Sequence, residues 1–206
     1  MPESLGGLTS MQAFVKRSFD LVFSFLGFAF LWWFILICYI LASIDTRSNG
    51  FFLQKRIGRN GRPFFFIKLR TMRVDPSFQT TVTTDHDPRI TRVGKFFRKT
   101  KLDELPQLIN VFLGQMSFVG PRPDVPGFAD KLQGSDRIIL AVRPGITGPA
   151  TLRYRTEEAL LAEQDDPERY NDEILWPEKV RLNREYVESW SFWGDLRWIL
   201  RTLGYK

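Results

Sequence analysis

The sequence predicts an α+β protein that is mostly helical, with a small β-hairpin or sheet, an N-terminal membrane-inserted helix and amphipathic interfacial helices. Three observations lead to this fold class: an uncharged apolar run near the N-terminus, two short Phe- and Ile-rich segments joined by Asn-Gly, and helical spacing of apolar residues through much of the remainder. The 206 residues are 44% hydrophobic, which is enough for one globular unit beyond the run. We therefore expect two parts, residues 1–48 and 49–206.

The apolar run extends from Leu21 to Ile44 without a single charged residue. At about 1.5 Å of rise per helical residue, it is long enough to cross a hydrocarbon core of about 30 Å. A buried core helix rarely excludes every charge over this length, and Ile40-Leu41-Ala42 lacks the small-residue form of a signal-peptide cleavage site. Basic residues flank both ends, so the positive-inside rule gives no direction. The helix therefore either spans the bilayer or enters it and turns back.

The elements that follow have local signals. Residues 51–55 and 63–69 are rich in Phe and Ile and predict two strands, and Gly58-Arg59-Asn60-Gly61 between them is typical of a hairpin turn. Apolar spacing predicts a helix over residues 89–99, and residues 106–113 predict a second, shorter helix.

Two Gly- and Pro-rich stretches, residues 114–127 and 143–149, predict structured loops, after which the chain is expected to be mostly helical. Residues 190–201 place three Trp among Arg and aliphatic side chains. This segment either buries its aromatic face in the core or lies in the headgroup layer, where Trp is favoured. Different faces of one helix can satisfy both.

Composition limits the chemistry. The single Cys38 lies inside the apolar run and the single His86 lies in a polar stretch, so zinc sites and Ser-His or Cys-His catalysis are not expected. A metal ion should instead be a hard cation held by carboxylate and phosphate oxygens, with Mg²⁺ the first expectation. Residues 46–101 hold fourteen Lys or Arg against three Asp, and such a segment attracts anions. Beside a membrane segment, lipid headgroups and substrate phosphates are the expected anions, and no nucleic-acid-binding motif accompanies the charge.

Asp103 and Glu104 are adjacent acids directly before Pro106, which is best tolerated in the first turn of a helix. A helix N-terminus stabilises a carboxylate, which suits a nucleophile or a Mg²⁺ ligand. Taken alone, the pair is more often a helix cap without chemistry.

The neighbouring basic residues favour chemistry. Arg98 lies within a few residues of the acids, and Arg122 is held between two prolines, which restrict its backbone. Arg143 precedes another Pro-Gly loop, and Arg155 follows it. Acids that bind a divalent cation, surrounded by Arg on stiff loops, are the composition of a phosphoryl-transfer site.

With these motifs the sequence resembles the bacterial monotopic phosphoglycosyl transferases, also called bacterial sugar transferases. The match extends over nearly the whole chain and is similar to the minimal single-domain members. The densest block is RKTKLDELPQLINVFLGQMSFVGPRP, residues 98–123. The other matching motifs are Lys16-Arg17-Ser18-Phe19-Asp20, Gln54-Lys55-Arg56-Ile57-Gly58, Lys68-Leu69-Arg70-Thr71-Met72, Thr91-Arg92-Val93-Gly94 and Arg143-Pro144-Gly145-Ile146-Thr147-Gly148.

The resemblance implies transfer of a sugar-1-phosphate from a UDP-sugar to a polyprenol phosphate, usually undecaprenyl phosphate, with release of UMP. It implies that Asp103 attacks the β-phosphorus and forms a covalent phosphosugar intermediate in a ping-pong scheme, that Glu104 assists, and that Asp103 also binds Mg²⁺. The residues expected to hold phosphates and the nucleotide are Lys68, Arg98, Arg122, Arg143 and Arg155. The catalytic domain, residues 49–206, is expected on the cytoplasmic face of the bacterial inner membrane, at the first membrane step of glycoconjugate or polysaccharide assembly.

Two departures from the family pattern stand out. Many relatives carry a Ser-Pro that kinks the membrane helix so that it re-enters, whereas this chain has Trp32-Trp33 at that place and no proline between Asp20 and Phe51. The re-entrant geometry is nevertheless expected by resemblance. The second departure is an acidic region, residues 156–176, which either shapes a pocket or forms a solvated face.

Two rival classes remain open. One is a non-catalytic membrane scaffold that keeps the fold without turnover. The other is a membrane-associated, Mg²⁺-dependent hydrolase that cleaves a phosphate ester or pyrophosphate with water in place of the prenol. No motif in the sequence specifies the sugar or the oligomeric state.

Overall fold

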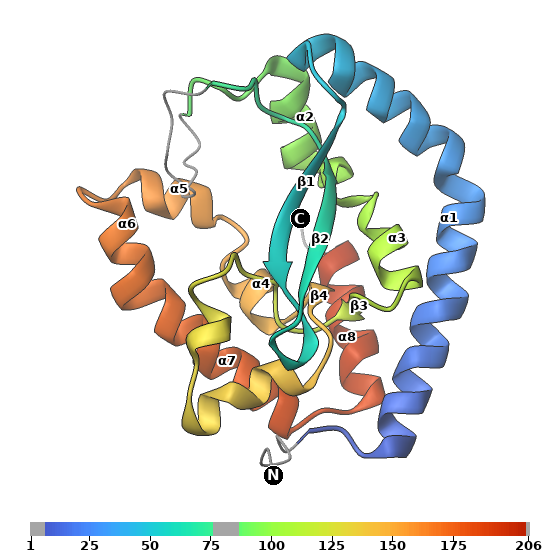
Figure 1. The fold of residues 1–206 in the computed structure, drawn as a ribbon, viewed down its shortest axis with the longest axis vertical. Helices are drawn as coiled ribbons and strands as arrows, with labels where there is room; N and C mark the ends of the chain where they lie inside the picture. The colour runs from blue at the N-terminus through green and yellow to red at the C-terminus, as the bar shows by residue number, and fades with distance from the viewer. Residues whose placement is uncertain (1–6, 76–86, 205–206) are drawn as a thin grey trace.

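A computed structural model describes residues 7–75 and 87–204, so His86 lies outside the described residues. Helix α1 (Ser10–Thr46) forms one continuous arc along the side of an α+β body (Figure 1). Thr9 caps its first turn by accepting a hydrogen bond from the Gln12 amide, and Arg47 ends it in the left-handed conformation. At 37 residues the helix is about 55 Å long, so the predicted apolar helix is confirmed and extends further toward the N-terminus.

One face of α1 packs against the body, and the opposite face is apolar and exposed. The helix contacts α2, α3 and α8 as well as both strands of the hairpin. Trp32 and Trp33 are 54% and 52% exposed, and many other large apolar side chains lie on the same outer surface. By length and composition, α1 is the one helix in the described part of the chain that could cross a membrane. Because α1 runs unbroken, a re-entrant path remains a prediction.

The two predicted strands form an antiparallel hairpin. Strand β1 (Phe51–Ile57) pairs with β2 (Pro63–Leu69) along their full lengths, so β1 extends two residues further than the sequence predicted. The turn between them, η1 (Arg59–Gly61), has positive φ at Asn60 and Gly61, as expected of an Asn-Gly turn.

The next segment leads to the adjacent acids. Helix α2 (Arg92–Thr100) begins three residues later than predicted, because the Thr91 side chain caps it by accepting a hydrogen bond from the Gly94 amide. A 3₁₀ turn, η2 (Leu102–Glu104), follows and carries both acids, and α3 (Gln107–Phe112) begins after Pro106.

The two Gly- and Pro-rich stretches contain more structure than loops. They hold β3 (Ser117–Val119) and β4 (Gly145–Thr147), which pair in parallel, and the 3₁₀ segments η3 (Ala129–Lys131) and η4 (Gly134–Ala141) lie between them. A Cβ atom on Gly145 would lie 2.1 Å from the Gly120 amide nitrogen. Glycine is needed here because the two loops pack backbone against backbone.

The remainder is helical, as predicted. It comprises α4 (Pro149–Arg153), α5 (Glu157–Ala162), α6 (Pro167–Tyr170), the π-helical turn η5 (Asn171–Leu175), α7 (Trp176–Glu188) and α8 (Phe192–Gly204). Trp198 and Ile199 of α8 pack against a buried cluster around Val119, whereas Trp193 and Leu203 are 71% and 79% exposed. The two expected roles of this segment therefore fall on different faces of one amphipathic helix.

Three charged residues near the start of α1, which we call the anchor triplet (Lys16, Arg17 and Asp20), fasten it to the body. The Lys16 ammonium donates to the Val119 carbonyl at 2.8 Å and pairs with Asp195 of α8. The Asp195 carboxylate also accepts hydrogen bonds from the Tyr186 hydroxyl, at 2.7 Å, and from the indole N–H of Trp190.

The other two members of the triplet bond to backbone. The Arg17 guanidinium donates to the Val111 and Phe112 carbonyls, at 2.7 and 2.8 Å, and so satisfies the last turn of α3. Oδ1 of Asp20 accepts from the Ser117 hydroxyl and the Phe118 amide at the start of β3. The triplet thus fixes α1 against α3, β3 and α8 at once.

Candidate active site

Asp103 and Glu104 lie together in the η2 turn and have different surroundings. Asp103 is buried, and its Oδ1 has no hydrogen-bond partner among the described residues. Glu104 accepts a hydrogen bond from Arg122 at 2.8 Å, across the gap between η2 and the Gly-Pro-Arg-Pro loop. One acid is therefore held by an ion pair, and the other keeps an unused oxygen.

Basic residues from three separate elements converge on the acid pair. Lys68 comes from β2, Arg98 from the end of α2, and Arg122 from the loop after β3. Arg98 pairs with Glu158 of α5 through one guanidinium nitrogen, while its Nη1 is buried without a partner in the described structure. Three predicted phosphate-binding residues are thus brought together with both predicted catalytic acids.

The charges perturb one another. Burial and the neighbouring Glu104 raise the pKa of Asp103 to about 6, although Lys68 and other nearby cations oppose the shift. Burial lowers the pKa of Lys68 to about 8, against the opposing attraction of Asp103. Burial alone would raise the pKa of Glu104, but Arg122 outweighs it and the pKa falls. The acids lie just before the start of α3, as predicted, but burial and the like charge of Glu104 outweigh any stabilisation of the Asp103 carboxylate by that helix.

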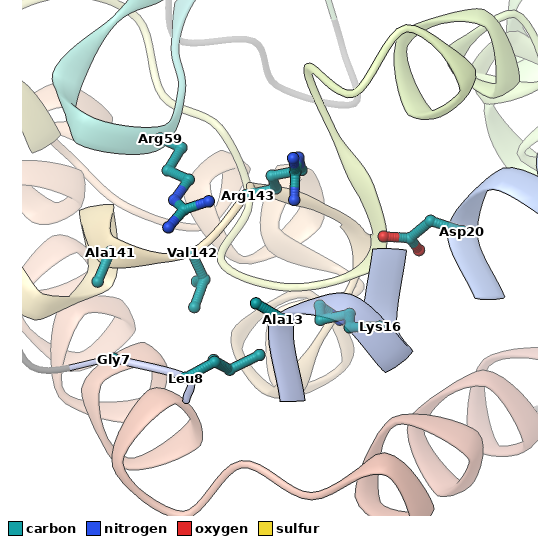
Figure 2. Close-up of a pocket in the computed structure, with 9 residues that line it drawn as sticks. All are labelled: Gly7, Leu8, Ala13, Lys16, Asp20, Arg59, Ala141, Val142 and Arg143. Carbon is teal, nitrogen blue, oxygen red and sulfur yellow. The ribbon is translucent and has the colours of Figure 1, made fainter. Parts of the chain in front are cut away.

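The structure places Arg143 at the opposite end of α3 from the acids, and it places Arg155 before α5. Nε of Arg143 donates to the Gly114 carbonyl just after α3, whereas the acids precede the start of that helix. Arg143 instead lines a cavity against α1 (Figure 2). Arg155 is exposed in the turn before α5, a few residues from Glu158. Arg143 is therefore separated from the acid pair by the length of α3.

Sequence reasoning missed several residues of the site. Nη1 of Arg56 donates to the Pro123 carbonyl beside Arg122, and burial lowers the pKa of Arg56 to about 10. Burial raises the pKa of Asp124 to about 6, and Arg56 opposes this shift. Glu157 pairs with Lys179 of α7 at 2.6 Å. Arg56 lies inside a motif on which the resemblance depends, so its place in the site could have been inferred. The ion pair between Glu157 of α5 and Lys179 of α7 could be recognised only from the tertiary structure.

Two buried amide side chains lie on α3, the helix that follows the acids. Asn110 of α3 donates to the Phe65 carbonyl at 2.7 Å and accepts from the Ile67 amide, which fixes α3 against the strand that carries Lys68. Gln107 is fully buried, one turn earlier on the same helix, and neither end of its amide has a partner among the described residues. Such an orphaned amide in a native site points to a bound ligand or water.

The donor set fits a Mg²⁺ ion that is shared with a substrate. Across residues 7–75 and 87–204, no group of three metal-binding side chains is assembled. Mg²⁺ is commonly held by one or two carboxylates together with substrate phosphates and water. The free Oδ1 of Asp103, with Glu104 beside it, provides such a partial coordination shell.

Comparisons with known proteins identify the family of this chain. The family model described as bacterial sugar transferase matches residues 11–205. The chain is 38% identical over 160 residues to a putative undecaprenyl-phosphate N-acetylgalactosaminyl 1-phosphate transferase of Bacillus subtilis, a match that covers 75% of this chain and 86% of that protein. It is 36% identical over 206 residues to galactosyl transferase CpsE of Streptococcus agalactiae, covering 91% of this chain and 41% of that protein.

A third relative is the UDP-glucose:undecaprenyl-phosphate glucose-1-phosphate transferase of Escherichia coli, which is 34% identical over 203 residues. That match covers 95% of this chain and 41% of the relative, so the chain spans about two fifths of the length of two of these three proteins. The family match includes α1, the acid pair and α8 alike. The chain belongs to the bacterial sugar transferase family.

Proposed function

We propose that this protein transfers a sugar-1-phosphate from a UDP-sugar to polyprenol phosphate, with undecaprenyl phosphate as the expected acceptor, and releases UMP. The family supports this proposal, because two of the relatives above are named for transfer of a sugar 1-phosphate to undecaprenyl phosphate. One observation on the site carries it: buried Asp103 offers an unpaired carboxylate oxygen among Lys68, Arg98 and Arg122.

The chemistry follows from that arrangement. A carboxylate oxygen of Asp103 attacks the β-phosphorus, the bond from the β-phosphorus to the bridging oxygen breaks, and UMP leaves with that oxygen. The sugar phosphate is then bound to Asp103 as an acyl phosphate. A phosphate oxygen of polyprenol phosphate attacks the same phosphorus, and Asp103 leaves as a carboxylate. Splitting the transfer lets one small site treat two large anionic substrates in turn.

The cations stabilise the negative charge on the diphosphate throughout. Lys68 and Arg98 lie on the Asp103 side, and Arg122 lies beside Glu104. Asp103 would hold Mg²⁺, which when bound neutralises charge on the phosphate oxygens. Glu104, kept ionised by Arg122, positions that guanidinium. We assign contact with the nucleotide to Arg155, which is exposed in the turn before α5.

The membrane supplies the lipid acceptor. The exposed apolar face of α1 suits the acyl region, and exposed Trp193 and Leu203 of α8 suit the headgroup layer. We therefore assign the protein to the bacterial inner membrane, with residues 49–206 on the cytoplasmic face, where UDP-sugars are available. The apolar helix is the support for this assignment.

The decisive test is UMP release by the purified protein with Mg²⁺, undecaprenyl phosphate and a panel of UDP-sugars. UMP release should need one sugar of the panel and, beyond a first turnover, should need undecaprenyl phosphate. Asp103→Asn should abolish it. Without the acceptor, a radiolabelled sugar phosphate should remain bound to the wild-type protein and be absent from Asp103→Asn.

The rival functions give different results. UMP release that continues at full rate without polyprenol phosphate would identify a hydrolase. No UMP release with any UDP-sugar, together with unaltered behaviour of Asp103→Asn, would identify a scaffold.

A further inference from the structure

A second cluster of basic residues surrounds a cavity at the start of α1, apart from the acid pair. The cavity has a volume of about 90 Å³. Arg59 reaches it from the hairpin turn and Arg143 from the loop before β4, and both side chains line the cavity (Figure 2). Lys16 and Asp20 of α1 line its other side.

Among the described residues, neither Arg59 nor Arg143 forms an ion pair, in contrast to Lys16. Lys16 is already paired with Asp195. Arg143 uses its Nε on a backbone carbonyl, and the Arg59 side chain has no hydrogen bond or ion pair within the described residues. Burial lowers the pKa of Arg143, and the like charges of Arg17 and Arg59 lower it further, whereas Asp20 opposes the shift.

Among the described residues, Asp20 is the one acid that lines the cavity. Its Oδ1 is used by β3, and its Oδ2 is buried without a partner in the described structure. The carboxylate of Asp20 offsets part of the positive charge of Arg59 and Arg143, and Arg17 adds to that charge. The cavity therefore keeps a net positive charge, which suits a phosphate group.

We propose that this cavity binds the phosphodiester of a membrane phospholipid headgroup, at a site separate from the acid pair. Planar guanidinium groups recognise phosphate oxygens through paired hydrogen bonds. The depth is appropriate, since Asp20 is followed directly by the apolar run that begins at Leu21. Exposed Phe14 lies on α1 between the lining residues Ala13 and Lys16, and exposed Leu113 adjoins the carbonyl that Arg143 contacts. The inference rests on the membrane association proposed above.

The test compares two phosphate sources on the full-length protein in a neutral detergent. Thermal unfolding is followed by tryptophan fluorescence during titration with dioctanoyl phosphatidylglycerol or with inorganic phosphate, at constant ionic strength. Arg59→Gln removes one cation, and this exposed side chain has no partner whose loss would unfold the protein. Arg62→Gln is the matched control, because Arg62 is exposed at the end of the same turn and does not line the cavity.

Phosphatidylglycerol should raise the Tm of wild type and Arg62→Gln, and Arg59→Gln should need about tenfold more lipid for the same shift. An equal dependence on Arg62, or no dependence on Arg59, would overturn the proposal. An Arg59-dependent shift with inorganic phosphate at the same concentrations would overturn the lipid assignment and give the site to free phosphate.

UMP release on the same preparations separates this inference from the proposed function. Wild-type protein that releases UMP but shows no Arg59-dependent shift refutes the lipid site alone. An Arg59-dependent lipid shift without UMP release refutes the transferase alone.

Discussion

The two ends of the short helix α3 gather charged residues in opposite ways. At its C-terminal end, the anchor triplet is bonded through Lys16 and Arg17 to named partners, so these cations are satisfied. At its N-terminal end, Oδ1 of Asp103 and Nη1 of Arg98 are buried without partners in the described residues. Helix α3 therefore has charges that stabilise the fold at its C-terminal end. At its N-terminal end it has buried charged groups that lack partners in the described structure.

The difference teaches which charges stabilise and which are available for chemistry. A buried polar group without a partner costs free energy, so its retention needs another reason. The perturbed pKa values of Asp103, near 6, and Lys68, near 8, lie at the N-terminal end of α3. Shifts of this kind concentrate at functional sites. The comparison gives a simple rule: variants at one end should lower activity, and variants at the other should lower stability.

Asp103→Asn is the largest expected effect. The variant removes the nucleophile and should lower kcat by about a thousandfold or more, equivalent to about 4 kcal/mol of activation free energy. Because it also removes a buried charge without a partner on Oδ1, Tm should stay constant or rise. Single-turnover UMP release and thermal unfolding measure the two effects. A fall in Tm that accompanies the loss of activity would break the comparison, since it would place Asp103 among the structural charges.

Lys16→Met tests the structural charges at the C-terminal end of α3. It leaves the Asp195 carboxylate buried with only the Tyr186 and Trp190 donors, and should lower the free energy of unfolding by about 3 kcal/mol. The kcat of the folded fraction should stay near the wild-type value. Chemical denaturation in detergent measures the stability.

The double variant Lys16→Met with Asp195→Leu is the control for Lys16→Met. It replaces the pair by apolar side chains and should recover much of the lost stability. A Lys16→Met variant with full stability but reduced kcat would reverse the assignment of the two ends.

Much of the fold was predictable because its signals are local. The hairpin around Asn60, the apolar run and the helical C-terminal part depend on turn chemistry and periodicity within short windows. The parallel pair of β3 and β4 was missed, because two three-residue strands far apart in sequence carry no pattern of their own. Their pairing depends on the backbone contact of Gly120 with Gly145, which only the tertiary structure reveals.

The site was predictable where residue type and resemblance were sufficient. Asp103, Glu104, Lys68, Arg98 and Arg122 are brought together as predicted. Arg143 was grouped with them because it too is an Arg beside Pro and Gly, a signal that cannot tell one end of α3 from the other. Gln107 was missed because a buried amide without a partner is visible only when its surroundings are known.

The pH dependence of kcat/KM tests the roles of Asp103 and Lys68 at the N-terminal end of α3. Asp103 must be ionised to attack, so kcat/KM should fall below about pH 6, and Lys68 must be protonated to attract phosphate, so kcat/KM should also fall above about pH 8. At pH 9 the protonated fraction of Lys68 is about tenfold lower than at low pH. Lys68→Arg should keep the acid limb and lose the alkaline limb, because Arg stays charged.

Initial rates with a limiting UDP-sugar, measured from pH 5 to about pH 9.5 in buffers of constant ionic strength, give the profile. An alkaline limb that persists in Lys68→Arg would assign it to another group and remove Lys68 from the site.

The smallest expected effect concerns the acidic region. Glu158 of α5 holds the Arg98 guanidinium, which we expect to receive substrate phosphate, so substrate must displace that carboxylate. Glu158 is partly exposed, and an ion pair of this kind is worth about 0.2–1 kcal/mol. Glu158→Gln should therefore lower KM for the UDP-sugar by up to about fivefold and leave kcat unchanged. Glu173→Gln, which breaks the exposed Arg169–Glu173 pair on neighbouring helical turns, should change neither constant. A higher KM in Glu158→Gln would mean that the carboxylate positions Arg98 for substrate instead of competing with it, and α5 would then belong to the satisfied, structural charges.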